Sequence, residues 1–253
     1  MNWRGLWTLF MKESRRFLSV AVQTLFAPVV TTLLYLLVFG QLLDEESVAF
    51  RGVDYAHFLV PGLAMMALMQ NAFANSSSSL IQSKMHGNIV FLLLAPLSPL
   101  EIYLAFLGSA VLRGLLVGLM VFLVGWLGYG VSWQAPGWIL LFAVLSGAVM
   151  GGLGIMAGIL SEKYDHLAAF QNFIVVPLTF LSGVFYSIHQ LPPVWQQASH
   201  FNPFFYMVDG FRYGFFQQSD VPLGVSLSVT FGFLALVSAI NLWLLVKGVK
   251  IRH

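Results

Sequence analysis

The sequence predicts an all-α integral membrane protein with six transmembrane helices. Of the 253 residues, 58% are hydrophobic and only 9% are charged, whereas roughly 25% of an ordinary soluble domain is charged. Four long runs lack any Asp, Glu, Lys or Arg, namely Phe17–Leu43, Tyr55–Ser83, Gly114–Ser161 and Val221–Val246. About 20 apolar residues cross the hydrocarbon core, so every run is long enough to span a bilayer. A β-barrel would need short strands that alternate apolar and polar residues, and these runs are uniformly apolar.

The composition also excludes several classes of protein. With 12 basic and 10 acidic side chains, a soluble enzyme of this size could not cover its surface. The absence of cysteine excludes a disulfide scaffold, and a net charge of +2 gives no argument for nucleic acid. We therefore expect residues 1–253 to form one domain within the lipid bilayer.

Residues 1–16 predict a helix that lies along the membrane surface. Arg4, Thr8, Lys12 and Arg15 share a polar face. The apolar residues at helical spacing are Trp3, Leu6, Trp7, Phe10 and Phe17. A short anchor with no further role is the other interpretation. No cleavage pattern follows the basic residues, so we expect no signal peptide.

Six helical spans are expected, because an unpaired backbone amide in lipid costs several kcal/mol. The expected spans lie near residues 18–43, 58–82, 102–127, 138–160, 167–187 and 223–246. Gly128-Tyr129-Gly130 and Ala135-Pro136-Gly137 divide the longest apolar run.

Particular residues within these spans predict bends and close packing. Pro28 and Pro177 should bend the first and fifth spans. Pairs of glycine at a spacing of four predict close helix contacts, and Ser76–Ser79 either packs helices or lines a wet path. The pairs are Gly114 and Gly118, Gly147 and Gly151, and Gly154 and Gly158.

The distribution of Lys and Arg predicts that both termini are cytoplasmic. The side that holds the termini carries nine basic residues, whereas the other side carries Arg51 and Arg212. The nine are Arg4, Lys12, Arg15, Arg16, Lys84, Lys163, Lys247, Lys250 and Arg252. The loop with Asp44, Glu45, Glu46 and Asp54 is then external.

A cytoplasmic connection, residues 84–99, carries an unusual apolar patch at Ile89–Leu94. We expect a short helix on the membrane surface, with Ile89, Leu92 and Leu93 available to a partner. A plain surface loop is the alternative, but such a loop seldom exposes six consecutive apolar residues, which call for contact with lipid or protein.

The external stretch at residues 187–220 is rich in aromatic side chains and is divided by Pro192-Pro193 and Asn202-Pro203. We expect two short helices that enter the outer leaflet and return, with their backbone buried against protein. Asp209 and Arg212 stand three residues apart, so one helix face could hold them as an ion pair. The segment is either a plug that stabilises the fold or an outer gate, and we favour a structural element that also gates.

Arg113 falls near the middle of the third span, where an arginine costs about 2.5–3.5 kcal/mol on insertion scales. It is either a contact for an anionic substrate group in the translocation path or a packing cation. A packing cation would be satisfied by carbonyls, serines or Glu101 of a neighbouring chain, because Glu101 of the same helix is about 18 Å away.

Motifs for catalysis and nucleotide binding are missing. The sequence has no Gly-x-x-x-x-Gly-Lys-Ser/Thr, His-Glu-x-x-His or Gly-x-Ser-x-Gly, and its six histidines do not fall at metal-ligand spacings. We therefore expect no catalytic residue and no metal or cofactor bound by this chain.

Several segments together resemble the permeases of ABC type-2 transporters, which include bacterial exporters of polysaccharides, nodulation lipo-oligosaccharides and drugs. The resemblance covers the whole chain. It is carried by Val60-Pro61-Gly62, Ala95-Pro96-Leu97-Ser98-Pro99, Gly183-Val184-Phe185-Tyr186-Ser187, Leu191-Pro192-Pro193, Asn202-Pro203, Tyr206 and Arg212.

The resemblance implies a permease dimer, joined through spans one and five, with two cytoplasmic ATPase subunits that bind ATP and magnesium. It assigns the interfacial helix to the N-terminus and external re-entrant helices to Gly183–Phe216. The implied ATPase-coupling residues are Lys84, His86, Ile89, Phe91, Leu92 and Leu93, with Glu162, Lys163 and Asp165 as a second contact. Lys84 is nearly the only charged residue in the first segment, which favours binding of the ATPase through apolar contacts. The residues assigned to the external gate are Tyr186, Trp195, Asn202, Pro203, Tyr206, Asp209 and Arg212.

We therefore expect the permease subunit of an ATP-driven exporter in a bacterial inner membrane, working by alternating access. An autonomous secondary transporter or channel is the alternative, but it predicts acidic residues at span centres, where the sequence has none. A membrane enzyme would need polar residues converging at one depth, and Arg113 alone does not provide them.

Overall fold

The computed structural model describes residues 2–42, 48–50 and 52–250, and the described chain is almost entirely helical. The helices are α1 (Trp3–Leu18), α2 (Ala27–Leu42), α3 (Tyr55–Met85), α4 (Ile89–Leu94), α5 (Pro99–Tyr129), α6 (Pro136–Leu160), α7 (Tyr164–Phe170), α8 (Val176–Phe180), α9 (Pro193–His200), α10 (Pro203–Phe216) and α11 (Leu223–Lys247). An antiparallel pair of strands, β1 (Val48–Phe50) and β2 (Val53–Asp54), precedes α3. The predicted acidic loop at Asp44–Glu46 lies outside the described residues.

Five helical segments in the described residues are long and apolar enough to cross a membrane. They are Val22–Phe39, Tyr55–Met85, Pro99–Tyr129, Pro136–Leu160 and Leu223–Lys247. The segment expected as the fifth of six spans, near residues 167–187, is helical from Tyr164 to Phe180 and then turns into irregular structure.

The bends predicted at proline take the form of π-helical turns. The π-helix η1 (Val22–Phe26) ends two residues before Pro28, and η2 (Gln171–Val175) ends two residues before Pro177. Proline cannot donate to the carbonyl of residue i−4 and its ring collides with that carbonyl. The preceding turn therefore widens into a π-helical turn at each of the two prolines.

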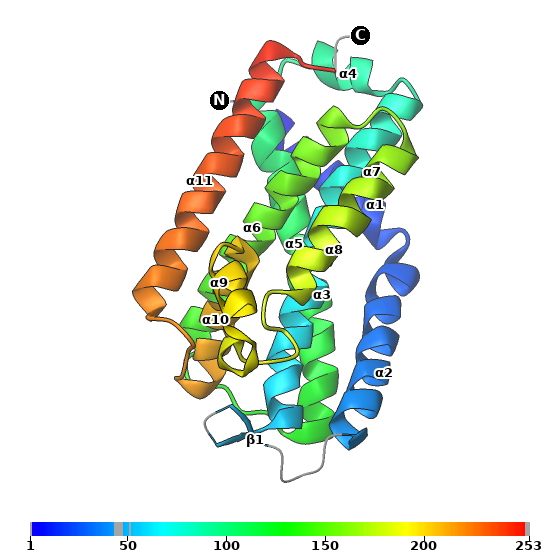
Figure 1. Cartoon of the computed structure of the whole chain (residues 1–253). Coiled ribbons are helices and arrows are strands. Elements are labelled where there is room, and N and C mark those ends of the chain that lie inside the picture. Colours follow the sequence, from blue (N-terminus) through cyan, green and yellow to red (C-terminus); the bar gives the residue numbers. More distant parts are fainter. Residues whose placement is uncertain (1, 43–47, 51, 251–253) are drawn as a thin grey trace.

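Helix α3 occupies the centre of the bundle and packs against α5 and α6, whereas α2 and α11 lie at the periphery (Figure 1). Small residues permit this close packing. A Cβ added to Gly158 of α6 would lie 2.8 Å from Leu80 Cβ and 3.1 Å from the carbonyl oxygen of Ser77 on α3. The Ser76 hydroxyl donates to the carbonyl of Gly151 at 2.7 Å. The glycine pairs and this serine thus serve helix packing within the chain.

The two ends of the bundle carry different elements (Figure 1). Both termini, α4 and the α6–α7 turn lie at one end, which we call the terminal end. The β1–β2 hairpin lies at the opposite end, with α9 and α10 in the half of the bundle nearest to it. An even number of membrane crossings would place both termini at the same end of the bundle.

Candidate functional site

The apolar patch predicted in the first cytoplasmic connection is a short helix, α4, at the terminal end. Its two sides have different surroundings. Ile89 is buried and Leu92 packs beside it in a cluster formed by α1, α3, α5 and α6. Phe91 and Leu94 are about three-quarters exposed, at 74% and 76%, and Leu93 is 38% exposed. The expectation that Ile89 is open to a partner is therefore wrong, because Ile89 attaches α4 to the bundle, whereas Leu92 is partly exposed.

Lys84 is held by the end of α6. Its ammonium group donates to the carbonyl oxygens of Ile159 at 2.8 Å and Ser161 at 2.6 Å, which are unpaired at a helix C-terminus. Lys250 donates to Glu162 at 2.8 Å, and this bond lowers the pKa of the Glu162 carboxyl. Hydrogen bonds thus connect the C-terminal ends of α3, α6 and α11 at the terminal end.

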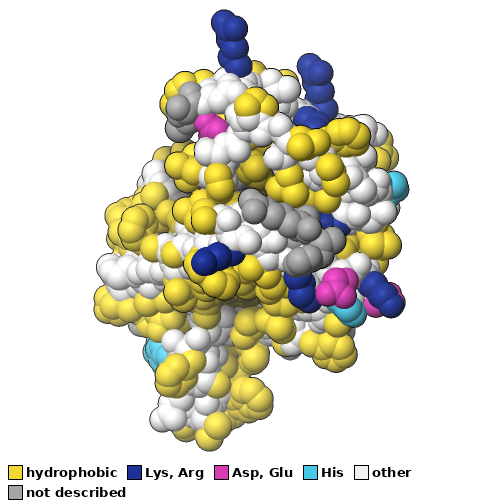
Figure 2. Space-filling view, turned by 90° about the horizontal axis from the view of Figure 1, so that it is seen from above, with side chains coloured by type: hydrophobic (Ala, Val, Ile, Leu, Met, Phe, Trp, Pro, Cys, Tyr) yellow, Lys and Arg dark blue, Asp and Glu magenta, His cyan; other side chains and the backbone are white. Residues whose placement is uncertain are grey.

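The second predicted contact, the α6–α7 turn, also faces outward. Glu162, Lys163 and Asp165 are all exposed, and so is His86, whose ring nitrogen lies 2.8 Å from the carbonyl of Gln82. Figure 2 shows this end of the molecule, where basic side chains project among hydrophobic ones. Both predicted contacts therefore have exposed residues at the terminal end, and their role in coupling stays a prediction.

Arg212 of α10 draws together three segments that carry the family resemblance. Its guanidinium donates to the carbonyls of Gly183 at 2.9 Å and Val184 at 3.4 Å, and it stands 3.7 Å above the centre of the Phe58 ring. A Cβ on Gly62 would lie 2.6 Å from the Val184 carbonyl oxygen, so only glycine fits there. Arg212 therefore fastens α10 to α3 and to the loop after α8.

Asp209, one turn earlier in α10, has different partners. It accepts hydrogen bonds from the backbone amide of Asp220 at 2.7 Å and the hydroxyl of Ser226 at 3.1 Å. The described residues contain no ion pair between Asp209 and Arg212. The predicted pair is thus wrong, because α10 directs Asp209 toward the start of α11 and Arg212 toward α3.

Asn202 shapes the turn between α9 and α10. Its side-chain oxygen accepts from the Phe204 amide at 3.0 Å and caps α10, in which Pro203 is the first residue. Its amide nitrogen donates to the carbonyl of Leu178 at 2.7 Å, across to α8. This single buried side chain begins one helix and ties it to another.

The aromatic residues of the external segment divide into anchored and exposed groups. The Tyr206 hydroxyl donates to the carbonyl of His200 at 2.9 Å, and the Tyr186 hydroxyl donates to that of Phe180 at 3.2 Å. Trp195 of α9 is 51% exposed. The two short helices predicted here are therefore present, and most of their predicted residues hold the fold together.

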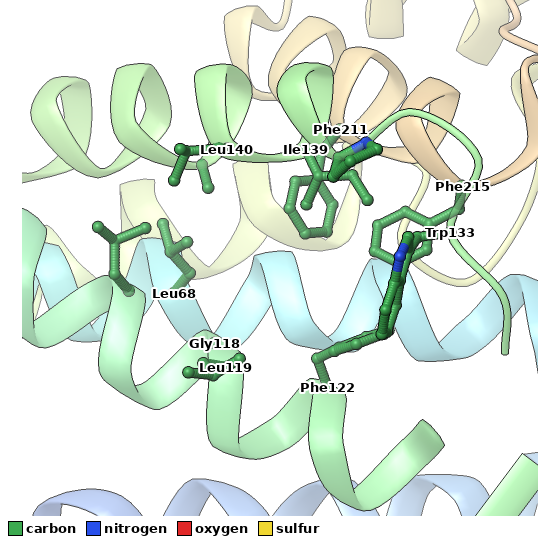
Figure 3. Close-up of a pocket in the computed structure, with 12 residues that line it drawn as sticks. Leu68, Gly118, Leu119, Phe122, Trp133, Ile139, Leu140, Phe211 and Phe215 are labelled. Atoms are coloured by element: carbon green, nitrogen blue, oxygen red, sulfur yellow. The ribbon is translucent and has the colours of Figure 1, made fainter. Parts of the chain in front are cut away.

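A cavity of about 360 Å³ lies between α3, α5, α6 and α10 (Figure 3). The rings of Phe122 and Trp133 stand 5.8 Å apart at one side of it. No charged side chain lines it; the lining residues are Leu68, Leu115, Gly118, Leu119, Phe122, Trp133, Pro136, Ile139, Leu140, Ala143, Phe211 and Phe215. An apolar cavity of this kind suits hydrocarbon and does not hold water.

Arg113 is partly buried on α5 and donates to the side-chain oxygen of Asn71 at 3.2 Å. The Glu101 carboxylate accepts from the backbone amides of Asn2 and Ser98 in its own chain. The partner of Arg113 was missed by sequence reasoning. Asn71 and Asn75, four residues apart in a membrane helix, were the available signal.

The described residues contain no cluster of three or more His, Cys, Asp or Glu side chains that could hold a metal ion. The surfaces available for function are therefore the face at the terminal end, the apolar cavity and the surroundings of Arg113.

Comparison with known proteins identifies the class to which these features belong. Residues 4–216 match the family model described as "ABC-2 type transporter". The inner membrane transport permease YadH of Escherichia coli (strain K12) is 38% identical over 254 aligned positions, covering 100% of this chain and 98% of the relative.

More distant relatives carry the name nodulation protein J. The protein from Neorhizobium galegae is 24% identical over 84% of this chain and 80% of its own length, and that from Rhizobium leguminosarum bv. trifolii is 26% identical over the same shares. The YadH relatives are named as transport permeases, which agrees with the missing enzyme motifs. Like the YadH relatives, the chain is a membrane transport protein and not an enzyme. The match over most of its length shows that the chain belongs to the ABC-2 type transporter family.

Proposed function

We propose that the chain is the permease subunit of an ATP-driven exporter in the bacterial inner membrane, with both termini in the cytoplasm. Two copies form the translocation path, and a separate ATPase subunit that binds ATP and magnesium drives the change between inward-open and outward-open states. Membership of the family and the name of the E. coli relative support this function.

The observation that carries the proposal is the exposed side of α4. Phe91 and Leu94 are exposed on α4, which lies at the terminal end, and an apolar patch there would be unfavourable in water unless a partner covers it. The buried side of α4 packs on the bundle through Ile89. A push on α4 is therefore transmitted to the transmembrane helices, and ATPase closure can favour one state only by binding the two states with different free energy.

The proposal includes a sixth crossing by the helical run Tyr164–Phe180. At 1.5 Å per residue this run spans about 25 Å, a little less than the hydrocarbon core of about 30 Å. Phe173, in its π-helical turn, is 82% exposed, and α2 leaves most of its apolar side chains uncovered. A second copy of the chain that packs against these two helices would cover both.

The N-terminal helix fits an interfacial position in the same scheme. Trp3 and Trp7 are 69% and 60% exposed on one side of α1, whereas Leu9 and Phe17 face the bundle. Tryptophan prefers the boundary between headgroups and hydrocarbon. The external segment, anchored by Arg212 and Asn202, closes the opposite end of the path.

The docking role of α4 is tested by the variant Phe91→Asp. The ATPase is co-expressed with the tagged permease and the two are purified together. We expect Phe91→Asp to reduce recovery of the ATPase by at least about tenfold, because a carboxylate would be buried without a partner. Val194→Asp is the matched control, since Val194 is 76% exposed on α9, away from the terminal end. Equal recovery of the ATPase with both variants would remove the docking role of α4.

A further inference from the structure

Arg113 is a cation inside a membrane helix that has few hydrogen-bond partners and no ion-pair partner among the described residues. Its one hydrogen bond in the described structure goes to a neutral amide, Asn71, at 3.2 Å. Its Nε–H is buried and has no partner, and no carboxylate of the described residues lies within ion-pair distance. Charged side chains within membrane spans normally pair with one another or face a polar pathway.

A second arginine contacts α3 one helical turn after Asn71. Arg16 of α1 donates to the backbone carbonyl of Asn75 at 2.7 Å and to its side-chain oxygen at 3.2 Å. Asn75 follows Asn71 by one helical turn, which is about 5.4 Å along α3. The Asn75 amide donates in turn to Ser109 at 2.9 Å, one turn before Arg113 on α5. The two guanidinium groups are therefore close enough for their charges to interact.

The other buried arginine, Arg212, has more partners than Arg113, although its Nε–H is also buried without a hydrogen bond. It donates to the carbonyls of Gly183 and Val184, lies over the Phe58 ring and stands near Asp209 and Asp220. Arg113 has no comparable set of partners. Glu13 pairs with Arg16 at 3.2 Å and with Lys12 at 3.5 Å, so one carboxylate faces three cations and the group of Lys12, Glu13, Arg16 and Arg113 keeps a net positive charge.

The Glu13 and Arg16 part of this group is reached from the terminal end. A cavity of about 300 Å³ between α1 and the end of α3 is lined by Lys12, Glu13, Arg16, Ser79, Gln82 and His86, among others. It opens beside the exposed ammonium of Lys12. A negatively charged group that approaches from this end therefore meets Lys12 first and then Arg16, with Arg113 one turn deeper.

We propose that Arg16 and Arg113 bind the phosphate group of an amphipathic molecule whose apolar part lies in the leaflet at the terminal end. Guanidinium donors form a planar fork that matches phosphate oxygens, and a phosphodiester whose headgroup carries no cation brings a net negative charge to this positive group. The phosphate would accept the unpaired Nε–H of Arg113 and supply its counter-ion. This site does not depend on an ATPase partner or on the direction of transport.

Thermal unfolding of the purified chain in a neutral detergent tests the site. Phosphatidylglycerol, phosphatidylcholine and inorganic phosphate are added separately. We expect phosphatidylglycerol to raise Tm by about 5 °C at saturation, phosphatidylcholine to raise it far less, and Arg113→Gln and Arg16→Gln each to abolish the difference. Arg15→Gln, which removes an exposed neighbouring charge, should keep it. A shift with inorganic phosphate that Arg113→Gln abolishes would support the same site with a soluble source.

The Tm of Arg113→Gln without added lipid distinguishes an anion-binding role of Arg113 from a purely structural role. Removing an uncompensated charge is often neutral or stabilising, so Arg113→Gln without lipid should unfold at or above the wild-type Tm. A clear loss of Tm together with an unchanged lipid-dependent shift would overturn the proposal. So would wild-type protein that responds to neither phosphatidylglycerol nor phosphate.

Arg113→Lys keeps the charge and provides a test if the glutamine variant does not fold. We expect lysine, which lacks the planar fork, to weaken phosphatidylglycerol binding by about tenfold in a titration. Unchanged affinity for phosphatidylglycerol in Arg113→Lys would contradict recognition by the guanidinium.

Discussion

Replacing Gly62 by alanine should strongly destabilise the junction between α3, α10 and the loop after α8. The added Cβ would lie 2.6 Å from the carbonyl oxygen of Val184 and 3.1 Å from the Arg212 guanidinium nitrogen. A carbon and an oxygen atom need more than 3 Å, so either the backbone at Val184 or the helix must move. That carbonyl and the adjacent one of Gly183 are the acceptors of Arg212.

Two contributions set the magnitude of this effect. Overpacking of a filled interior costs about 1–3 kcal/mol, and weakening a hydrogen bond from a charged donor adds about 1.5–3 kcal/mol if the bond is lost. We expect Gly62→Ala to lower the free energy of unfolding by about 2–4 kcal/mol. For a chain of this size that corresponds to a Tm lower by about 5–15 °C.

Thermal unfolding in detergent, followed by tryptophan fluorescence, measures the effect. Gly232→Ala in α11 is the matched control, because no atom lies within 4 Å of the position its Cβ would take. Alanine there should stabilise the helix by about 0.5–1 kcal/mol. If Gly62→Ala unfolds at the same temperature as Gly232→Ala, the packing of Arg212 and Gly62 described above is incorrect.

Two further variants test single polar contacts by the same measurement. Asn202→Ala removes both the cap of α10 and the bond to Leu178 and should cost about 2 kcal/mol; Asn202→Asp keeps the acceptor and should cost less, so equal losses would contradict the capping role. Ser98→Ala removes one half of the capping box with Glu101 that begins α5 and should cost about 0.5–2 kcal/mol; an unchanged Tm would show that α5 does not need this cap.

The elements with strong local signals were predictable from the sequence. Uniform apolar runs gave the long helices, and Pro28 and Pro177 marked the two bends because proline disturbs its own preceding turn. Pro192-Pro193 and Asn202-Pro203 also mark the starts of α9 and α10, as expected. Each of these predictions depends on residues that are neighbours along the chain.

The side-chain partners were less predictable, because they depend on how distant helices rotate against one another. A spacing of three made Asp209 and Arg212 look like a pair, but the buried carbonyls near Gly183 satisfy Arg212 instead. The apolar run at α4 showed no periodicity that would separate the buried Ile89 from the exposed Phe91. Periodicity alone cannot divide a uniformly apolar segment into inner and outer faces.

ATP hydrolysis by the purified chain in sealed proteoliposomes, with and without an added ATPase subunit, tests the central claim most directly. In the proposed function the chain supplies a path and a docking surface, and its sequence has no nucleotide-binding motif, so it should show no hydrolysis above empty vesicles. Addition of the ATPase should give vesicle-bound hydrolysis that Phe91→Asp removes. Steady hydrolysis by the chain alone, or binding of the ATPase that Phe91→Asp leaves unchanged, would contradict the account.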